Sequence, residues 1–188
     1  CGWETPEYCA LDAKEFHSGT KSLRLSIPQT TRYTQEGGFG WSAESRVTAF
    51  DLGRLRPACR YGHTVKNGLF KADLPDGKYS VKVTSNTSEL FEMKGDTRQP
   101  ITAKITEIPV PKGIENTIKE NTFDVTVEGG QFNLFIPSGS IYSLSITPKS
   151  GFGSVQAFDF GPGDAPVSAG HKLVSASRLS SVNIISAN

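Results

Sequence analysis

The sequence has 188 residues, of which 36% are hydrophobic and 10% aromatic, so it is long enough to form one substantial core. Its 20 Lys and Arg nearly balance its 19 Asp and Glu, and its pI of about 7.9 lies below the range typical of duplex nucleic-acid binders. It has no apolar run near the length of a membrane span. We therefore expect neither a nucleic-acid partner nor a membrane.

Segments that alternate polar and apolar residues, the pattern of half-buried strands, recur along the chain. The clearest are 21–27, 78–84, 122–127, 131–136 and 140–147, and shorter candidates are 69–72, 101–105, 155–160 and 182–185. Turn-forming residues separate them in Leu74-Pro-Asp-Gly77, Glu128-Gly-Gly-Gln131 and Pro137-Ser-Gly-Ser140. No segment predicts a convincing amphipathic helix. The sequence thus predicts an all-β fold, a jelly-roll β-sandwich, as a single domain over 1–188 with its core in 20–175.

Two stretches lack the strand pattern and are the expected functional loops, because binding residues concentrate on loops. One spans 31–60 and contains Gly37-Gly-Phe-Gly-Trp41, followed by several arginines. The other is Gly161-Pro-Gly-Asp-Ala-Pro166, a rigid loop that follows a predicted strand.

The three cysteines, Cys1, Cys9 and Cys59, do not have the spacing of zinc ligands. A catalytic pair of Cys59 with His63 is one interpretation, and a buried thiol or half of a disulfide is the simpler one. If one bridge exists, we expect Cys1 to pair with Cys9, which implies an extracytoplasmic protein.

The sequence lacks the common catalytic patterns. A retaining glycosidase needs two carboxylates about 5 Å apart, and no strand carries the alternating acidic residues that would place them so. There is no nucleophile elbow of the G-x-S-x-G type, and His17, His63 and His171 are widely separated. We therefore expect a protein that is not an enzyme.

Sugar-binding chemistry fits the segment 33–63 better. A sugar presents an apolar C–H face flanked by hydroxyls, so proteins bind it with an aromatic ring and with directional hydrogen-bonding groups. The candidate ligand-binding residues are Trp41 and Tyr61 as stacking platforms, Arg54, Arg56 and Arg60 as polar or anionic contacts, and also Tyr33 and His63. The guanidinium groups would suit carboxylate or sulfate groups on an acidic polysaccharide. The alternative for Trp41 is a place in the core.

Three motifs resemble those of one family. Phe158-Asp-Phe-Gly-Pro-Gly-Asp-Ala-Pro-Val-Ser-Ala-Gly170, continuing to Val174, is similar to its F-D-F-G-P-G and the P-V-A-x-G-Y segment that follows, with His171 in place of the final Tyr. Tyr33-Thr-Gln-Glu-Gly-Gly-Phe-Gly-Trp41 is similar to its Y-S-x-E-x-G-Y-G-W. Leu69-Phe-Lys-Ala-Asp-Leu-Pro-Asp-Gly-Lys-Tyr-Ser-Val81 resembles its F-x-V-D-L-P-N-G-x-Y-x-V strand pair. The family is that of the galactose-binding-like carbohydrate-binding modules, which accompany rhamnogalacturonan acetylesterases and other polysaccharide-degrading enzymes. The resemblance implies a jelly roll that binds polysaccharide.

The order of these motifs differs from the family's order, because the F-D-F-G-P-G strand comes first there and near the C-terminus here. One interpretation is a circularly permuted module, in which 158–174 fills the sheet position before Arg32, since the ends of a sandwich often lie close together. The other is one module followed by the truncated start of a second. A strand at 155–160 lying outside the core would exclude the permutation.

A second resemblance concerns Ala10-Leu-Asp-Ala-Lys-Glu-Phe-His-Ser-Gly-Thr-Lys-Ser-Leu-Arg-Leu25, which is similar to the H-S-G-K-x-S-L strand of other jelly-roll carbohydrate-binding modules. In those folds the segment often borders a structural calcium ion, which takes about six to eight oxygen ligands. The resemblance implies that Glu15, the Gly19 carbonyl and Asp159 contribute calcium ligands.

Together these observations predict a monomeric, non-catalytic carbohydrate-binding module, secreted or at the cell surface. It would hold a polysaccharide-degrading catalytic domain of the same parent chain on a galactose-containing polymer such as agar, porphyran or a pectic chain. Two alternatives stay open: a small polysaccharide lyase or hydrolase on a jelly roll, and a structural or adhesion domain. The adhesion domain would bury Trp41 and leave no aromatic ring exposed in a groove.

Overall fold

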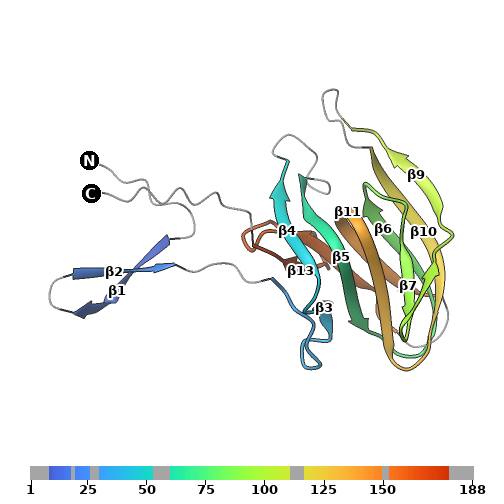
Figure 1. Ribbon diagram of the computed structural model, residues 1–188, viewed down its shortest axis with the longest axis horizontal. Coiled ribbons are helices and arrows are strands. Elements are labelled where there is room, and N and C mark those ends of the chain that lie inside the picture. Colours follow the sequence, from blue (N-terminus) through green and yellow to red (C-terminus); the bar gives the residue numbers. More distant parts are fainter. Residues whose placement is uncertain are drawn as a thin grey trace.

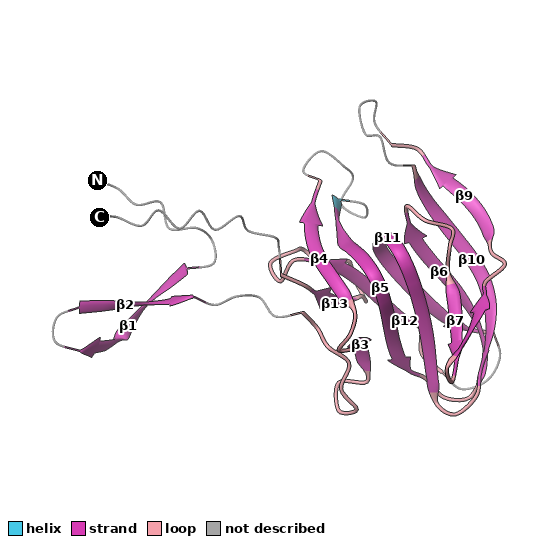
Figure 2. Ribbon diagram, viewed as in Figure 1, coloured by secondary structure: helices cyan, strands magenta, loops and turns pink. Residues whose placement is uncertain are grey.

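The structure, a computed structural model, describes residues 9–17, 20–25, 30–52, 60–110, 117–149 and 153–177, and for 9–25 it describes the backbone alone. The named elements of this part are all strands, with a single helical residue at Arg60, so the all-β prediction is confirmed (Figures 1 and 2). They are β1 (Cys9–His17), β2 (Thr20–Leu25), β3 (Phe39–Trp41), β4 (Arg46–Asp51), β5 (Tyr61–Asp73), β6 (Gly77–Ser85), β7 (Phe91–Lys94), β8 (Thr97–Pro100), β9 (Lys104–Ile108), β10 (Ile118–Val127), β11 (Gln131–Pro148), β12 (Gln156–Gly161) and β13 (Lys172–Ser175). In this described part, no helix has the length and hydropathy that crossing a membrane requires.

The hairpin β1–β2 is a two-stranded antiparallel sheet of its own, paired from Cys9 with Leu25 to His17 with Thr20. β2 therefore matches a predicted strand without joining the main sheet. Cys9 opens β1, whereas Cys1 and Cys59 lie outside the described residues, so the pairing of the cysteines stays a prediction.

The other eleven strands form one sandwich-like sheet that curls around a single main core (Figure 1). One path runs in the order β13-β12-β11-β6-β10-β9. β5 pairs with β11 and carries β3 and β4, while β7 pairs with β11 and carries β8. The prediction of a loop over 31–60 is wrong in part, because β3 and β4 lie within this range.

The long strand β11 connects the two halves of this sheet. Its first half pairs with β5 as far as Ile141, and its second half pairs with β6 and β12. The turn predicted at Pro137-Ser-Gly-Ser140 is therefore wrong. Pro137 has no N–H to donate, and it is tolerated because the ladder is interrupted there: the pairs Ile136–Gly68 and Ser138–Lys66 flank it in an unchanged register, and the facing Asn67 has a φ of 49°.

Aromatic and aliphatic side chains from both halves meet in the core. Its largest fully buried members are Trp41, Phe70, Phe132, Phe158, Phe160, Leu134, Ile136, Ile141, Leu144 and Ile146, while Ile118 and Tyr142 form a second, smaller cluster. Alternation explains the part of the core that lies on β6, β10 and the second half of β11, since a period of two sends every second side chain inward. The turn between β10 and β11 is confirmed, with Gly129 and Gly130 at φ 80° and 78°, which glycine adopts at low cost.

The C-terminal strands lie inside the sheet. β12 pairs antiparallel with β11, and β13 pairs parallel with β12. Phe158 and Phe160 are each 1% exposed, so the outcome that would have excluded a permuted module is not observed. The backbone N–H of Thr31 donates to the Ser175 carbonyl at 2.8 Å, which brings the start of the main sheet beside its end.

Candidate functional site

Two of the predicted ligand-binding residues are structural. Trp41 and His63 are each 0% exposed, so neither can stack on or contact a ligand at the surface, and these two predictions are wrong. Trp41 is buried because β3 lies against β5, where its ring packs on Phe70 and Phe160 at centroid distances of 5.5 and 5.7 Å. Gly40 permits the Arg32–Tyr33 backbone to approach the other edge of β3, since a Cβ there would lie 2.6 Å from the Arg32 carbonyl carbon.

His63 joins this buried group to the end of β12. The Trp41 Nε1–H donates to His63 Nδ1 at 3.1 Å, so the ring proton resides on Nε2, which donates to the Gly161 carbonyl at 3.1 Å. Burial lowers the pKa of His63 from 6.5 to about 4, because the interior disfavours the charged ring. His63 is thus a neutral connector between β5 and β12.

Tyr33 lies near the opposite end of β5 from Tyr61, so the structure does not bring these two predicted residues together. The Tyr33 hydroxyl donates to Asp73 at 2.9 Å and accepts from Gln131 at 2.9 Å, while Lys71 lies 5.4 Å from its ring centroid. The Asp73 carboxylate holds the pKa of Tyr33 above its usual value. A strand as long as β5 spans roughly 40 Å, which separates the two tyrosines.

Arg60 and Tyr61 do lie together at the start of β5. The Arg60 guanidinium binds Asp51 through two hydrogen bonds of 2.7 and 2.9 Å and stands 4.9 Å from the Tyr61 ring centroid. The Asp51 carboxylate raises the pKa of Arg60 further. Arg60 is therefore committed to Asp51, while Arg54 and Arg56 lie outside the described residues.

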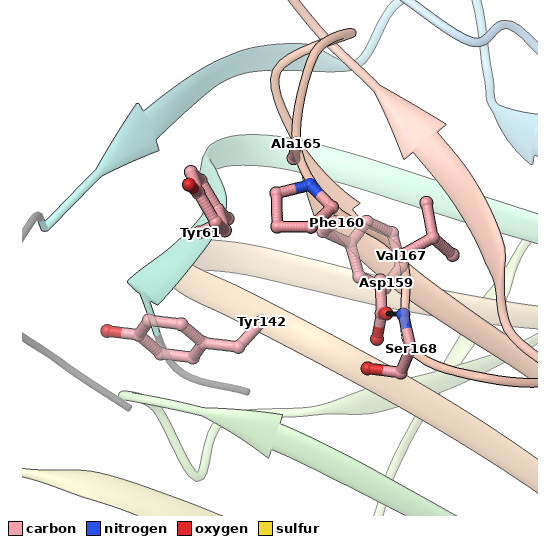
Figure 3. Close-up of a pocket in the computed structure, with 8 residues that line it drawn as sticks. Tyr61, Tyr142, Asp159, Phe160, Ala165, Val167 and Ser168 are labelled. Carbon is pink, nitrogen blue, oxygen red and sulfur yellow. Dashed lines mark hydrogen bonds between the residues drawn. The ribbon is translucent and has the colours of Figure 1, made fainter. Parts of the chain in front are cut away.

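A surface hollow of about 120 Å³ opens beside Tyr61 (Figure 3). We call it the loop hollow. Its lining comes from the start of β5, from β11, from β12 and from the loop that follows β12: Tyr61, Tyr142, Asp159, Phe160, Ala165, Pro166, Val167 and Ser168. The two tyrosines lie on one side, and Asp159, Val167 and Ser168 lie across from them (Figure 3). The aromatic faces thus stand opposite a carboxylate.

The loop of the hollow is held by Asp159. One carboxylate oxygen contacts His171 Nδ1 at 2.7 Å, and the other accepts the Ser168 backbone N–H at 2.7 Å. The Asp159 side chain is 17% exposed, and a carboxylate offers about four lone-pair sites, so these two bonds leave acceptor capacity toward the hollow. Asp159 can therefore position the loop and still accept hydrogen bonds from hydroxyl groups.

The predicted calcium site stays a prediction. Asp159 is engaged by His171 and Ser168, the side chain of Glu15 is not described, and Gly19 lies outside the described residues. Among the side chains that the structure describes, no group of three or more His, Cys, Asp or Glu is placed to hold a metal ion.

Sequence reasoning missed part of the hollow. The loop 161–166 was expected to be functional, but nothing linked it to Tyr61, about a hundred positions away. Val167 and Ser168 lie in the segment that resembles the family's P-V-A-x-G-Y, whereas Tyr142 carries no such signal, because its role arises from the contact of β5 and β11 with that loop.

Comparisons with known proteins are sparse. No protein-family model matches the sequence, and no curated protein matches it. Among solved structures, the crystal structure of the protein YxiM from Bacillus subtilis is similar, at 24% identity and a TM-score of 0.45. The match covers 64% of this chain and 34% of YxiM, so the chain spans about a third of the length of that protein.

Proposed function

We propose that this protein is a non-catalytic carbohydrate-binding module and that the loop hollow is its sugar-binding site. The observation that carries the proposal is the placement of the Tyr61 ring across a small hollow from the Asp159 carboxylate. An aromatic face packs on the C–H face of a sugar, and a carboxylate accepts hydrogen bonds from its hydroxyls.

The dimensions of the hollow favour one sugar unit at a time. Its volume of about 120 Å³ is below the roughly 300–1,000 Å³ of pockets that enclose a whole ligand. One ring would therefore dock there while the remainder of the polymer extends over the surface. The galactose-containing polymers expected from the motif resemblance remain the proposed targets.

The setting of the module belongs to the same proposal. We place it in a secreted or surface-attached parent protein, where it acts as a monomer and raises the local concentration of polysaccharide around an appended catalytic domain. A structural calcium ion is part of the proposal through the resemblance of the segment at 10–25.

One observation favours the adhesion alternative, since Trp41 is buried as that alternative expects. Its second expectation is not met, because the Tyr61 ring lines a surface hollow. For this reason we favour sugar binding.

The test is affinity gel electrophoresis against a panel of plant and algal polysaccharides that includes neutral and substituted galactans. We expect retardation on at least one galactose-containing polymer. The exposed valines provide a matched pair, since Val167 is 43% exposed at the hollow and Val155 is 55% exposed away from its lining. Val167→Asp should abolish the retardation and Val155→Asp should not. Absence of retardation on every polymer would refute the proposal.

A further inference from the structure

A second concave surface lies on the outer face of β4 and β5, and we call it the strand groove. Its volume is about 670 Å³, and it is lined by Arg46, Thr48, Ala49, Phe50, Asp51, Thr64 and Lys66. Residues of β4 and β5 alternate across the sheet, so the directly paired Arg46–Lys66, Thr48–Thr64 and Phe50–Gly62 follow one another along a single face. The groove therefore has a cationic end, a hydroxyl-lined middle and an aromatic end.

The cationic end is energetically unusual. Arg46 and Lys66 are exposed and directly opposite in the antiparallel pair, where Cβ atoms lie about 5 Å apart. Like charges in that position destabilise a sheet. The ion pairs found among the described residues involve Arg60, Lys82, Lys149 and His171, so neither Arg46 nor Lys66 is neutralised within that part of the chain. An anion bound between them would relieve the repulsion.

The remainder of the groove suits a sugar chain. Thr48 and Thr64 supply hydroxyls that both donate and accept hydrogen bonds. Phe50 offers a partly exposed ring four residues along β4 from Arg46, a distance of roughly 13 Å. The groove is therefore long enough for more than one pyranose unit. Gly62 makes room for this ring, because a Cβ there would lie 2.7 Å from Phe50 Cζ.

The strand groove is coupled to the loop hollow through direct contacts. Phe50 packs edge-on against Tyr142 of the hollow at a centroid distance of 5.6 Å. Asp51 of the groove binds Arg60, whose guanidinium stands over Tyr61 of the hollow. The two sites therefore flank one group of aromatic side chains.

We infer that the strand groove binds the carboxylate or sulfate groups of an acidic polysaccharide. The inference rests on the proposed function and names its substrate class: a galactose-containing polymer that carries uronate or sulfate groups. The aromatic and hydroxyl lining, together with the coupling to a sugar-sized hollow, favours a polysaccharide over an acidic peptide. The net charge of the whole chain is only +1, so a general attraction to polyanions would be weak and a local pair of cations must supply it.

The test compares four polymers with three proteins by calorimetry at low and at raised salt. The polymers are polygalacturonate, a sulfated galactan, a neutral galactan and poly-L-glutamate. The proteins are the wild type, the double variant Arg46→Ala/Lys66→Ala, and the control Lys78→Ala/Lys104→Ala, which removes two exposed cations from β6 and β9. Both double variants lose the same charge, so they differ in the location of the loss.

We expect the wild type to bind at least one acidic polysaccharide more tightly than the neutral galactan, with an advantage that shrinks as salt rises. The groove variant should lose about tenfold in affinity for the acidic polymer and keep its affinity for the neutral one. The control should stay within about twofold of the wild type for both. Comparison of polygalacturonate with the sulfated galactan identifies the anionic group.

The remaining outcomes are distinguishable. Equal losses in the groove variant and the control, or an unchanged affinity of the groove variant, would overturn the groove assignment while leaving the loop hollow in place. Poly-L-glutamate bound as tightly as the acidic polysaccharides would overturn the polysaccharide assignment. No binding to any polysaccharide would overturn the proposed function, and the groove inference with it.

Lys66→Glu provides a second readout. It places a carboxylate opposite Arg46, so the unfolding midpoint should not fall, and acid-polymer binding should be lost. A purely structural role for Lys66 predicts a lower midpoint instead, which would contradict the inference.

Discussion

The aromatic group around Trp41 and the aromatic group around Tyr61 lie on either side of the same stretch of β12 but have opposite relations to solvent. Trp41 is fully buried, and His63 links it to the Gly161 carbonyl from the inside. Tyr61 lines a surface hollow whose loop is anchored by Asp159 and His171. The Trp41 group holds the end of β12 by a hydrogen bond from His63, and the Tyr61 group lines the hollow together with the loop that follows β12.

This contrast shows that the surroundings of an aromatic side chain decide whether it can act as a binding platform. The Trp41 ring meets other aromatic rings on several sides, so its area contributes to folding. The Tyr61 ring meets a guanidinium and an open hollow, so part of its area remains available to a ligand. Substitutions in the two groups should therefore have different effects on folding and on binding.

The largest expected effect is on stability at Trp41. Trp41→Ala should lower the free energy of unfolding by about 3–5 kcal/mol, because it leaves a cavity and removes the hydrogen bond to His63. Tyr61→Ala should lower it by roughly 1–2 kcal/mol. Chemical denaturation measures both, and equal losses would contradict the distinction between the two groups.

The next effect is the pH dependence that His63 imparts. Its pKa is about 4 when folded and near 6.5 when unfolded, so the unfolded chain binds more protons between these values and stability rises with pH across that window. The contribution is complete above pH 6.5 and lost as the pH falls toward 4, by roughly 3 kcal/mol in total.

Denaturation of the wild type and of His63→Gln from pH 4 to 7 measures this slope. The glutamine amide can accept from Trp41 and donate to Gly161 without titrating, so the variant should show a flatter profile. Trp41→Phe keeps His63 buried and should keep the slope. Parallel profiles for wild type and His63→Gln would show that His63 is not a buried neutral ring.

A smaller effect distinguishes two glycines, one in each region. A Cβ on Gly68 would collide with Val65 Cγ1 and lie 2.9 Å from Trp41 Cζ3, so Gly68→Ala should cost about 1–3 kcal/mol through overpacking. A Cβ on Gly161 would lie 2.9 Å from Ala165 Cβ and 3.1 Å from Tyr61 Cβ. Gly161→Ala should therefore displace the loop and weaken polysaccharide binding more than Gly68→Ala does, while Gly68→Ala should lower the unfolding free energy more. If Gly68→Ala weakened binding more than Gly161→Ala, the binding site would lie elsewhere.

The strand pattern was predictable wherever one face is buried. β6, β10 and β12 follow from alternation, and paired glycines predict the turn before β11. β11 itself was divided in two, because a proline next to serine and glycine looks like a turn unless the interrupted pairing opposite Asn67 on the partner strand is known. Such cross-strand compensation is absent from a local sequence pattern.

The site was only partly predictable for the same reason. Tyr61 and the loop 161–166 were both identified, yet their contact is a product of the sheet order. Trp41 was misread because glycines around it suggested a loop, whereas Gly40 allows a strand to approach Arg32 closely. The cationic pair of the strand groove depends on the register of β4 and β5, which no local pattern fixes.

Sugar binding at the Tyr61 end of β5 can be measured with a matched pair of tyrosine variants. Tyr61 and Tyr33 are both partly buried, and each has a cation near its ring, at 4.9 and 5.4 Å from the centroid. Calorimetry with the polysaccharide that best retards the wild type should show Tyr61→Ala weakened about tenfold or more and Tyr33→Ala within about twofold. Full affinity in Tyr61→Ala, or an equal loss in Tyr33→Ala, would contradict the account.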